Sequence, residues 1–133
     1  MFIAIADCSL MAGPLANNNK PGTYARSIEQ ILKYNSMDID IGTAAMIISE
    51  QWSENVLGRQ YIFQLDEMAH DILNELKERG RSVDYRAIEV INDYLYNKVG
   101  FTTVETADDP EDLFLHSVLD NRKGYCLSLS VLY

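Results

Sequence analysis

Apolar residues recur every three or four positions along most of the chain that follows Pro21. In an α-helix this spacing places the side chains on one face, where they can be buried together. The pattern predicts a helix in each of five segments, residues 23–35, 36–52, 60–80, 82–101 and 108–124. The expected inner faces are Tyr24, Ile28, Ile31 and Leu32; Ile41, Ala44, Ala45, Ile48 and Trp52; Tyr61, Leu65, Met68, Ile72 and Leu76; Ala87, Ile88, Ile91, Tyr94 and Leu95; and Leu115, Val118 and Leu119.

Residues with strong capping preferences lie at the ends of these segments. Asp38 is the expected N-cap of the second helix, and Asp109, followed by a proline at the first helical position, is that of the fifth. Gly80, Gly100 and Gly124 follow the third, fourth and fifth helices, where a left-handed residue commonly ends a helix. The sequence therefore predicts an all-α fold of about five to six helices, packed as an orthogonal bundle.

The last nine residues, "YCLSLSVLY", have an ambiguous pattern. Leucine and serine alternate from Leu127 to Ser130, which is typical of a strand, but the alternation then breaks into a continuous apolar run. Such a short apolar stretch fits a buried helix as well as a strand. The pattern by itself leaves both structures open.

The first residues differ in composition from the rest. Gly13–Thr23 holds two prolines, two glycines and three consecutive asparagines, which is typical of a linker. The apolar run Phe2–Ala6 is short and has no basic residue before it, unlike a secretory signal. We expect residues 1–22 to be a disordered leader or the remnant of an export signal, and residues 23–133 to form one helical domain.

Length and charge narrow the classes of function. A chain of 133 residues, 47% hydrophobic and 23% charged, is an ordinary globular protein with one core. Its net charge of -9 argues against nucleic-acid binding, which needs clustered Lys and Arg, and against docking on an anionic membrane. No apolar run is long enough to span a bilayer.

Cys126 is the candidate for catalysis. We expect it and Cys8, at the other end of the chain, to be free thiols. If Cys126 lies in the first turn of a helix, the free N–H groups there favour the thiolate, which is the nucleophile. The alternative is that Cys126 is a small core residue, and spacing alone favours this alternative.

A cysteine nucleophile also needs a general base, normally a histidine. Only His70 and His116 are present. We expect His70 to face solvent and His116, between a buried Leu115 and an exposed Ser117, to be a surface or helix-packing residue. Neither histidine has a second ligand at helical spacing, so no metal and no cofactor are expected.

The stretch from Val90 to Tyr133 resembles bacterial proteins of the transglutaminase-like superfamily, in the SirB-type branch. The resemblance rests on a helix that ends in Gly-Phe, a "DP" before a leucine-rich helix, an "R-x-G", and a final "C-x-S-L-S-x-L-Y". The helices between Asp40 and Gly80 also look like the leading bundle of that branch. The last fifteen residues are the most specific part.

The resemblance implies that Cys126 is the nucleophile, at the start of the central helix of a papain-like α+β core. It thereby favours a helix for the last residues. In the family, a sheet that carries a histidine and an aspartate follows this helix. The chain is therefore expected to be an inactive N-terminal fragment, truncated after the cysteine helix, of a cysteine-dependent acyl-transfer or amide-hydrolysing enzyme.

Two further expectations concern partners and location. The substrate would be a protein or peptide, and the face of Leu129, Leu132 and Tyr133 on the last helix would be exposed and cause self-association. Alternatively, the chain is a non-catalytic helical interaction module. The sequence leaves the compartment open: a bacterial cytoplasm, or outside it if residues 1–16 are a signal remnant.

Overall fold

The structure, a computed structural model, describes residues 21–106 and 108–133. Helices are the main structure of the described residues, whose strands are two pairs of residues, so the predicted all-α class is confirmed. The α-helices are α1 (Ile28–Ile31), α2 (Ile41–Trp52), α3 (Gly58–Glu78), α4 (Ala87–Asn92), α5 (Leu115–Asn121) and α6 (Cys126–Leu132). Single turns and short segments join them: the 3₁₀ turns η1 (Pro21–Tyr24), η2 (Ser36–Asp38) and η4 (Pro110–Leu113), the π-helix η3 (Asp93–Val99), and the strands β1 (Thr102–Thr103) and β2 (Lys123–Gly124).

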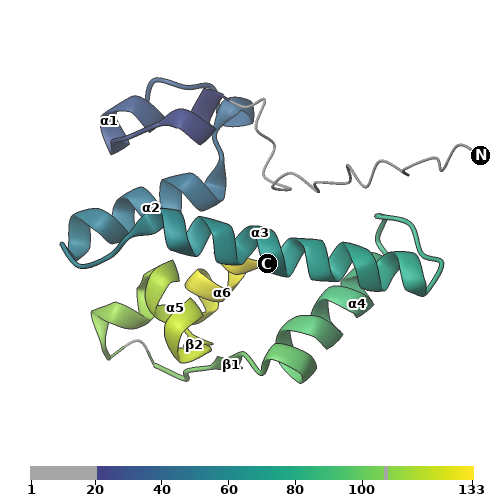
Figure 1. Cartoon of the computed structure of the whole chain (residues 1–133). Coiled ribbons are helices and arrows are strands. Elements are labelled where there is room, and N and C mark those ends of the chain that lie inside the picture. The colour runs from purple at the N-terminus through teal and green to yellow at the C-terminus, as the bar shows by residue number, and fades with distance from the viewer. Residues whose placement is uncertain (1–20, 107) are drawn as a thin grey trace, which may run out of the picture.

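Helix α3 runs through the middle of the molecule, and the other elements pack around it (Figure 1). Helix α2 packs beside its first half, α4 beside its last half, and α5 with α6 below it. The main core lies where these elements meet and consists of Met46, Met68, Tyr94, Leu95, Phe101, Leu115, Val118, Leu119 and Leu129. Two smaller clusters lie under α1 and beside α4.

Helix α3 agrees with the sequence in its inner face and its end. Met68 and Leu76 are buried, and the other predicted inner residues are half-buried against the core. Gly80 is left-handed (φ 61°), and the N–H of Arg81 donates to the carbonyl of Leu76 at 2.8 Å, which closes the helix as expected. Its start is capped from outside, because Glu50 of α2 accepts from the N–H of Gly58 at 2.7 Å.

The first predicted helix is much shorter than expected. Only the four residues of α1 are α-helical, and Tyr24 and Leu32 are exposed, contrary to prediction. The reason is that α1 lies at the edge of the molecule and packs on one side only. Ala25 and Ile31 contact Ile47 of α2, and Ile28 is half-buried against the same cluster.

The prediction for α2 is wrong in its cap and its buried face. Asp40, not Asp38, caps the helix by accepting from the N–H of Thr43 at 2.9 Å. The buried residues are Met46, Ile47 and Ser49, whereas the predicted Ile41, Ile48 and Trp52 are largely exposed. Helix α2 contacts α1 on one side and α3 and α5 on the other, so its buried face is rotated from the stripe that apolar spacing marks.

The fourth segment is helical but begins later and changes its winding. Helix α4 starts at Ala87 and passes into the π-helix η3, which ends at the left-handed Gly100 as predicted. Val90 is fully buried, whereas the predicted Ile88 is 51% exposed. The extra residue in the π-helical turn changes the angular spacing of the side chains, which a constant helical period does not describe.

The fifth segment is not one helix. Asp109 caps only the turn η4, and α5 begins after an extended Phe114. Its inner face of Leu115, Val118 and Leu119 is buried as predicted. The helix ends at Arg122, which takes the left-handed conformation (φ 53°), while Gly124 lies in β2 and is not a helix stop.

The last segment is a helix, α6, which decides between the two structures that its pattern left open. The predicted exposed face is partly wrong. Leu129 is buried in the core and Leu132 is half-buried, while Tyr133 is exposed. Leu127 and Val131 are the apolar residues of α6 that point away from the core.

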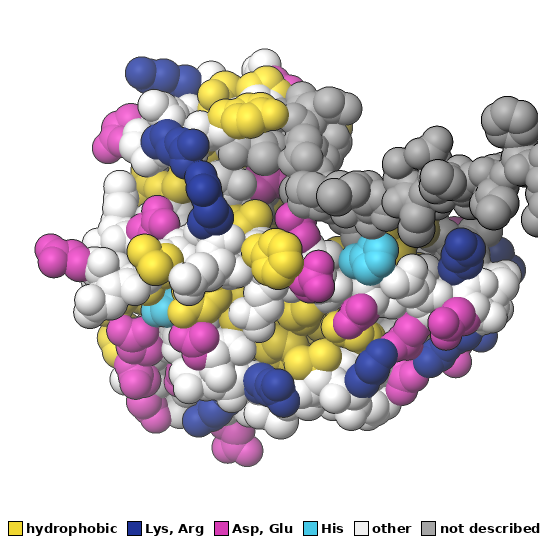
Figure 2. All heavy atoms as spheres, viewed as in Figure 1, with side chains coloured by type: hydrophobic (Ala, Val, Ile, Leu, Met, Phe, Trp, Pro, Cys, Tyr) yellow, Lys and Arg dark blue, Asp and Glu magenta, His cyan; other side chains and the backbone are white. Residues whose placement is uncertain are grey.

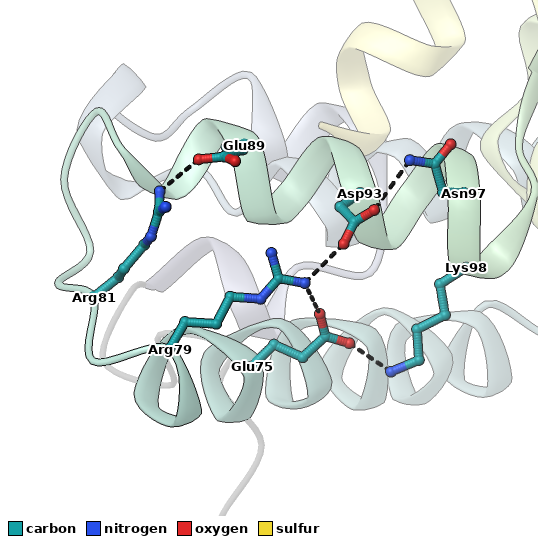
Figure 3. Close-up of polar contacts among 7 residues, drawn as sticks. All are labelled: Glu75, Arg79, Arg81, Glu89, Asp93, Asn97 and Lys98. Carbon is teal, nitrogen blue, oxygen red and sulfur yellow. Dashed lines mark hydrogen bonds and ion pairs between the residues drawn. The ribbon is translucent and has the colours of Figure 1, made fainter.

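Ion pairs connect the last turns of α3 to η3 (Figure 3). Glu75 receives Arg79 at 3.4 Å and Lys98 at 2.5 Å, and Arg79 also reaches Asp93 at 2.7 Å. Hydrogen bonds from Asn97, and then from Arg79, lower the pKa of Asp93. The four charges alternate in sign, so Arg79 and Glu75 each lie between two opposite charges, and Asp93 and Lys98 are the two ends of the series. Among the described residues, no helix has the length and apolarity needed to cross a bilayer.

Alanine substitutions at Gly124 and Gly42 test the packing of the helices, and we expect them to change stability in opposite directions. A Cβ on Gly124 would lie 2.8 Å from Val118 Cγ2 and 3.0 Å from Ser128 Oγ, so Gly124→Ala should lower the free energy of unfolding by about 1–3 kcal/mol. A Cβ on Gly42, in α2, would lie no closer than 3.6 Å to the side chains around it. Gly42→Ala should raise stability by about 0.5–1 kcal/mol, because alanine favours the helix. Urea unfolding of both variants checks this, and equal effects would contradict it.

Tyr94 should titrate unusually late. It is 4% exposed and its hydroxyl donates to Asp71 at 2.9 Å. Burial first, and then this bond, raise the pKa of Tyr94 from 10.0 to about 12. A raised pKa in the folded chain stabilises it fully below pH 10 and loses that effect as the pH rises toward 12. Tyrosinate absorbance should show a late step that is absent in Tyr94→Phe; a step that persists would contradict the assignment.

Candidate functional site

Cys126 is the first residue of α6, and its side chain is exposed. Tyr125 before it is extended (φ -77°, ψ 161°) and provides no side-chain cap. The first hydrogen bond of the helix runs from the N–H of Leu129 to the carbonyl of Tyr125, at 3.0 Å. The N–H groups of residues 126–128 precede this bond, so they carry the positive end of the helix dipole beside the thiol. The thiol thus lies in the first turn of a helix, the position on which the sequence argument for a nucleophile depended.

The backbone before Cys126 is held by the pair of short strands. β2 pairs with β1 in parallel, with Thr102 opposite Lys123 and Thr103 opposite Gly124. The N–H of Thr102 donates to Arg122 at 2.9 Å, and that of Val104 donates to Gly124 at 3.0 Å. The sequence analysis treated both segments as connector or helix end, because two-residue strands leave no periodic signal.

The turn η4 lies against the start of α6. The N–H of Tyr125 donates to the carbonyl of Asp112 at 3.4 Å. The hydroxyl of Ser128, one turn into the helix and 2% exposed, lies 2.7 Å from the same carbonyl and 3.0 Å from that of Tyr125. Ser130 is exposed and donates to the carbonyl of Cys126 at 2.7 Å. The start of α6 is therefore attached to η4 through the backbone N–H of Tyr125 and the side chain of Ser128.

Neither histidine contacts the thiol. Across residues 21–106 and 108–133, no hydrogen bond joins Cys126 to His70 or His116. His116 is 6% exposed, and its Nε2 lies 3.4 Å from Glu111 Oε2. Its Nδ1 is buried and has no hydrogen-bond partner in this part of the chain. His116 is therefore the helix-packing residue that the sequence suggested, although Ser117 beside it is buried and not exposed as predicted. His70 lies on α3 and is half-buried, not fully solvent-facing as expected.

Aromatic residues connect α2 to η4. The Trp52 ring stacks on Phe114 with centroids 4.8 Å apart and an angle of 23°, and its Nε1–H donates to Glu111 Oε1 at 3.0 Å. Phe114 and Tyr61 both pack against His116, with ring centroids 6.0 and 6.1 Å away. Sequence reasoning placed Trp52 in the core and missed this contact. Its partners lie about sixty residues away in the chain, where no periodic signal connects them.

An apolar cavity of about 380 Å³ opens between α3, α4 and the end of α6. It is lined by aliphatic side chains, among them Leu65, Met68, Ile72 and Leu132, and Tyr133 lies at the end of α6 beside it. On the face drawn in Figure 2, apolar side chains are visible at the centre and acidic ones toward the lower edge.

Within the described residues, no group of three His, Cys, Asp or Glu side chains could hold a metal ion. Cys8 lies outside the described residues.

Comparison with known proteins gives one match. The family model of the transglutaminase-like superfamily matches residues 59–133, which is more than half of the chain. The matched segment contains α3 from its second residue, α4, α5, α6 and Cys126, while α1 and α2, including Trp52, lie outside it. No curated protein and no solved structure matches the chain.

Proposed function

The chain belongs to the transglutaminase-like superfamily, and we propose that Cys126 is its nucleophile, in a cysteine-dependent acyl-transfer or amide-hydrolysing reaction. The observation that carries the proposal is the place of Cys126. It is an exposed thiol on the first residue of a helix, inside the segment that the family model matches. A core cysteine, the alternative that spacing favoured, would be covered by neighbouring side chains.

The proposed chemistry begins with attack of the thiolate on an amide or ester carbonyl of a protein or peptide. A carbon–sulfur bond forms, and the amine or alcohol leaves with a proton. The resulting thioester is then attacked by an amine, which gives a new amide, or by water, which gives an acid. Either attack releases the thiol. The N–H groups at the start of α6 would stabilise the negative charge that develops beside them in each attack.

We propose that the general base is not among the residues described here. His116 is enclosed by Phe114 and Tyr61 and lies beside Glu111, and His70 makes no hydrogen bond to the thiol within the described part. A base must come within hydrogen-bond reach of the proton that it removes. The 133 residues alone should therefore not turn over a substrate, although their thiol should react. The histidine and aspartate that complete such a site would be supplied outside them.

We further assign the chain to the SirB-type branch. The residues that support this assignment are Gly100-Phe101 at the end of η3, Asp109-Pro110 at η4, and the run from Arg122 through Cys126 to Tyr133. The helices between Asp40 and Gly80, α2 and α3, fit the leading bundle that this branch carries.

The second candidate is a non-catalytic interaction module. The observation in its favour is the outward face of α6, where Leu127 is 62% and Val131 is 38% exposed. These residues are four apart and therefore lie on one side of the helix, next to the exposed Cys126. Such a face suits contact with another protein surface.

Thiol alkylation tests the proposed nucleophile. The Cys8→Ser variant leaves Cys126 as the only thiol, and the Cys126→Ser variant leaves only Cys8. Folded Cys8→Ser should react with iodoacetamide at pH 7 several-fold faster than the same chain unfolded in urea, because only the folded helix start favours the thiolate. For Cys126→Ser, the folded and unfolded rates should be similar. Equal folded and unfolded rates at Cys126 would favour the interaction module.

Self-association provides a second test. If the outward face of α6 joins two copies of the chain, the apparent mass in sedimentation should rise with concentration. Leu127→Lys with Val131→Lys should abolish that rise, because the contact would then bury two positive charges on each copy. Leu32→Lys is the matched control, since Leu32 is 77% exposed and follows α1, which packs on α2. A monomer at every concentration would contradict self-association, and an equal effect of the control would contradict the role of α6.

A further inference from the structure

We propose that Ser128 is a positioning residue for Cys126, because its hydroxyl holds the start of α6 on the turn η4. This inference rests on the proposed function, in which Cys126 is the nucleophile. Ser128 never meets the substrate, since it is 2% exposed and points into the protein. Its role is to keep the thiol and the N–H groups around it in one fixed arrangement.

The geometry at Ser128 supports this role. Its Oγ lies 2.7 Å from the carbonyl of Asp112 and 3.0 Å from that of Tyr125. The first carbonyl belongs to η4, sixteen residues earlier in the chain, so this contact joins two separate elements. The N–H of Tyr125 reaches the same Asp112 carbonyl at 3.4 Å. Tyr125 and Ser128, which lie on either side of Cys126 in the sequence, therefore both donate to the carbonyl oxygen of Asp112.

Helix α6 needs such an attachment. It has seven residues, and a helix of that length is not stable in isolation. No side chain caps its start. The hydroxyl of Ser128 and the N–H of Tyr125 take the place of a cap by fastening the first turn to η4. Without them the first turn would fray, and the N–H groups would no longer stay beside the thiol.

The turn η4 is itself held from the other side. Asp109 caps it by accepting from the N–H of Glu111 at 3.0 Å. The Glu111 carboxylate accepts a hydrogen bond from Trp52 Nε1 at 3.0 Å, and its other oxygen lies 3.4 Å from His116 Nε2. A continuous set of contacts thus runs from Trp52 on α2, through η4, to Ser128 and Cys126. Helix α2 lies outside the segment that the family model matches, so the leading helices contribute to the position of the thiol.

Ser130 offers a matched control on the same helix. It is also a serine that donates to a backbone carbonyl, that of Cys126, at 2.7 Å. Its side chain is exposed, and its bond stays within α6. Replacing Ser130 therefore removes a similar hydrogen bond without loosening α6 from η4.

The experiment uses the full chain with Cys8→Ser, so that Cys126 is the only thiol, and compares Ser128→Ala with Ser130→Ala. Amide exchange at Tyr125 reports on the attachment, and the pH profile of iodoacetamide alkylation reports on the thiol. Ser128→Ala should lower the protection of the Tyr125 amide about fivefold, as expected for one lost hydrogen bond. It should also move the alkylation profile toward that of the chain unfolded in urea. Ser130→Ala should change each by less than about twofold.

Each outcome separates the inference from the function on which it rests. If Ser128→Ala leaves both measurements unchanged, or changes the amide alone, Ser128 is not a positioning residue. If the starting protein already alkylates like its unfolded form, the proposed function fails, while lost protection at Tyr125 would still support the attachment by Ser128.

A second variant covers the case in which Ser128→Ala does not fold. Trp52→Phe keeps an aromatic ring to stack on Phe114 but removes the indole N–H that donates to Glu111. Trp52 is 53% exposed, so the core is untouched. The variant should shift the Tyr125 amide and the alkylation profile in the same direction as Ser128→Ala, by a smaller factor. No shift in either would contradict the proposed path through η4.

Discussion

The close approach of β2 to α5 and α6 at Gly124 is the constraint on which the arrangement around Cys126 depends. The α-carbon of Gly124 lies so near Val118, Ser128 and Leu129 that no side chain fits there. This approach allows the strand pair, the turn η4 and the first turn of α6 to meet within a few residues of the thiol. It also buries Val118 completely, so the packing of the core and the geometry of the site are set by the same contact.

The other half of the molecule is held in a different way. Where α3 and η3 meet, alternating charges border the junction (Figure 3). Beside them, Leu95 packs in the core and the hydroxyl of Tyr94 donates to Asp71. Exposed ion pairs add little stability singly, so their main effect is on the angle and register at which the two helices meet. The π-helical winding of η3 belongs to this junction, because it turns Tyr94 and Leu95 inward before Gly100 ends the helix.

The leading helices are part of the same body as the matched family segment. Trp52 stacks on Phe114 and binds Glu111, and Glu50 caps α3 at Gly58. The first contact runs from α2 into the segment that the family model covers, and the second holds Gly58, the residue just before that segment. A chain that began at residue 59 would lose the cap of its longest helix and one of the supports of η4. The leading helices therefore help to hold the position of Cys126, whatever the role of its thiol.

The sequence by itself determined the helical class, the bounds of α3, the stops at Gly80 and Gly100, and the place of Cys126 before an apolar run. Each of these follows from local periodicity or from the backbone freedom of one residue, which depend on nearby positions alone. Tertiary structure decided which face of α2 is buried, that Gly124 lies in a strand, and that Trp52 contacts η4. These features depend on which elements meet in space, and residues about sixty positions apart leave no joint pattern in the sequence. The helix at Cys126 is an intermediate case, because its pattern allowed two structures and its packing on α5 and β2 selected one.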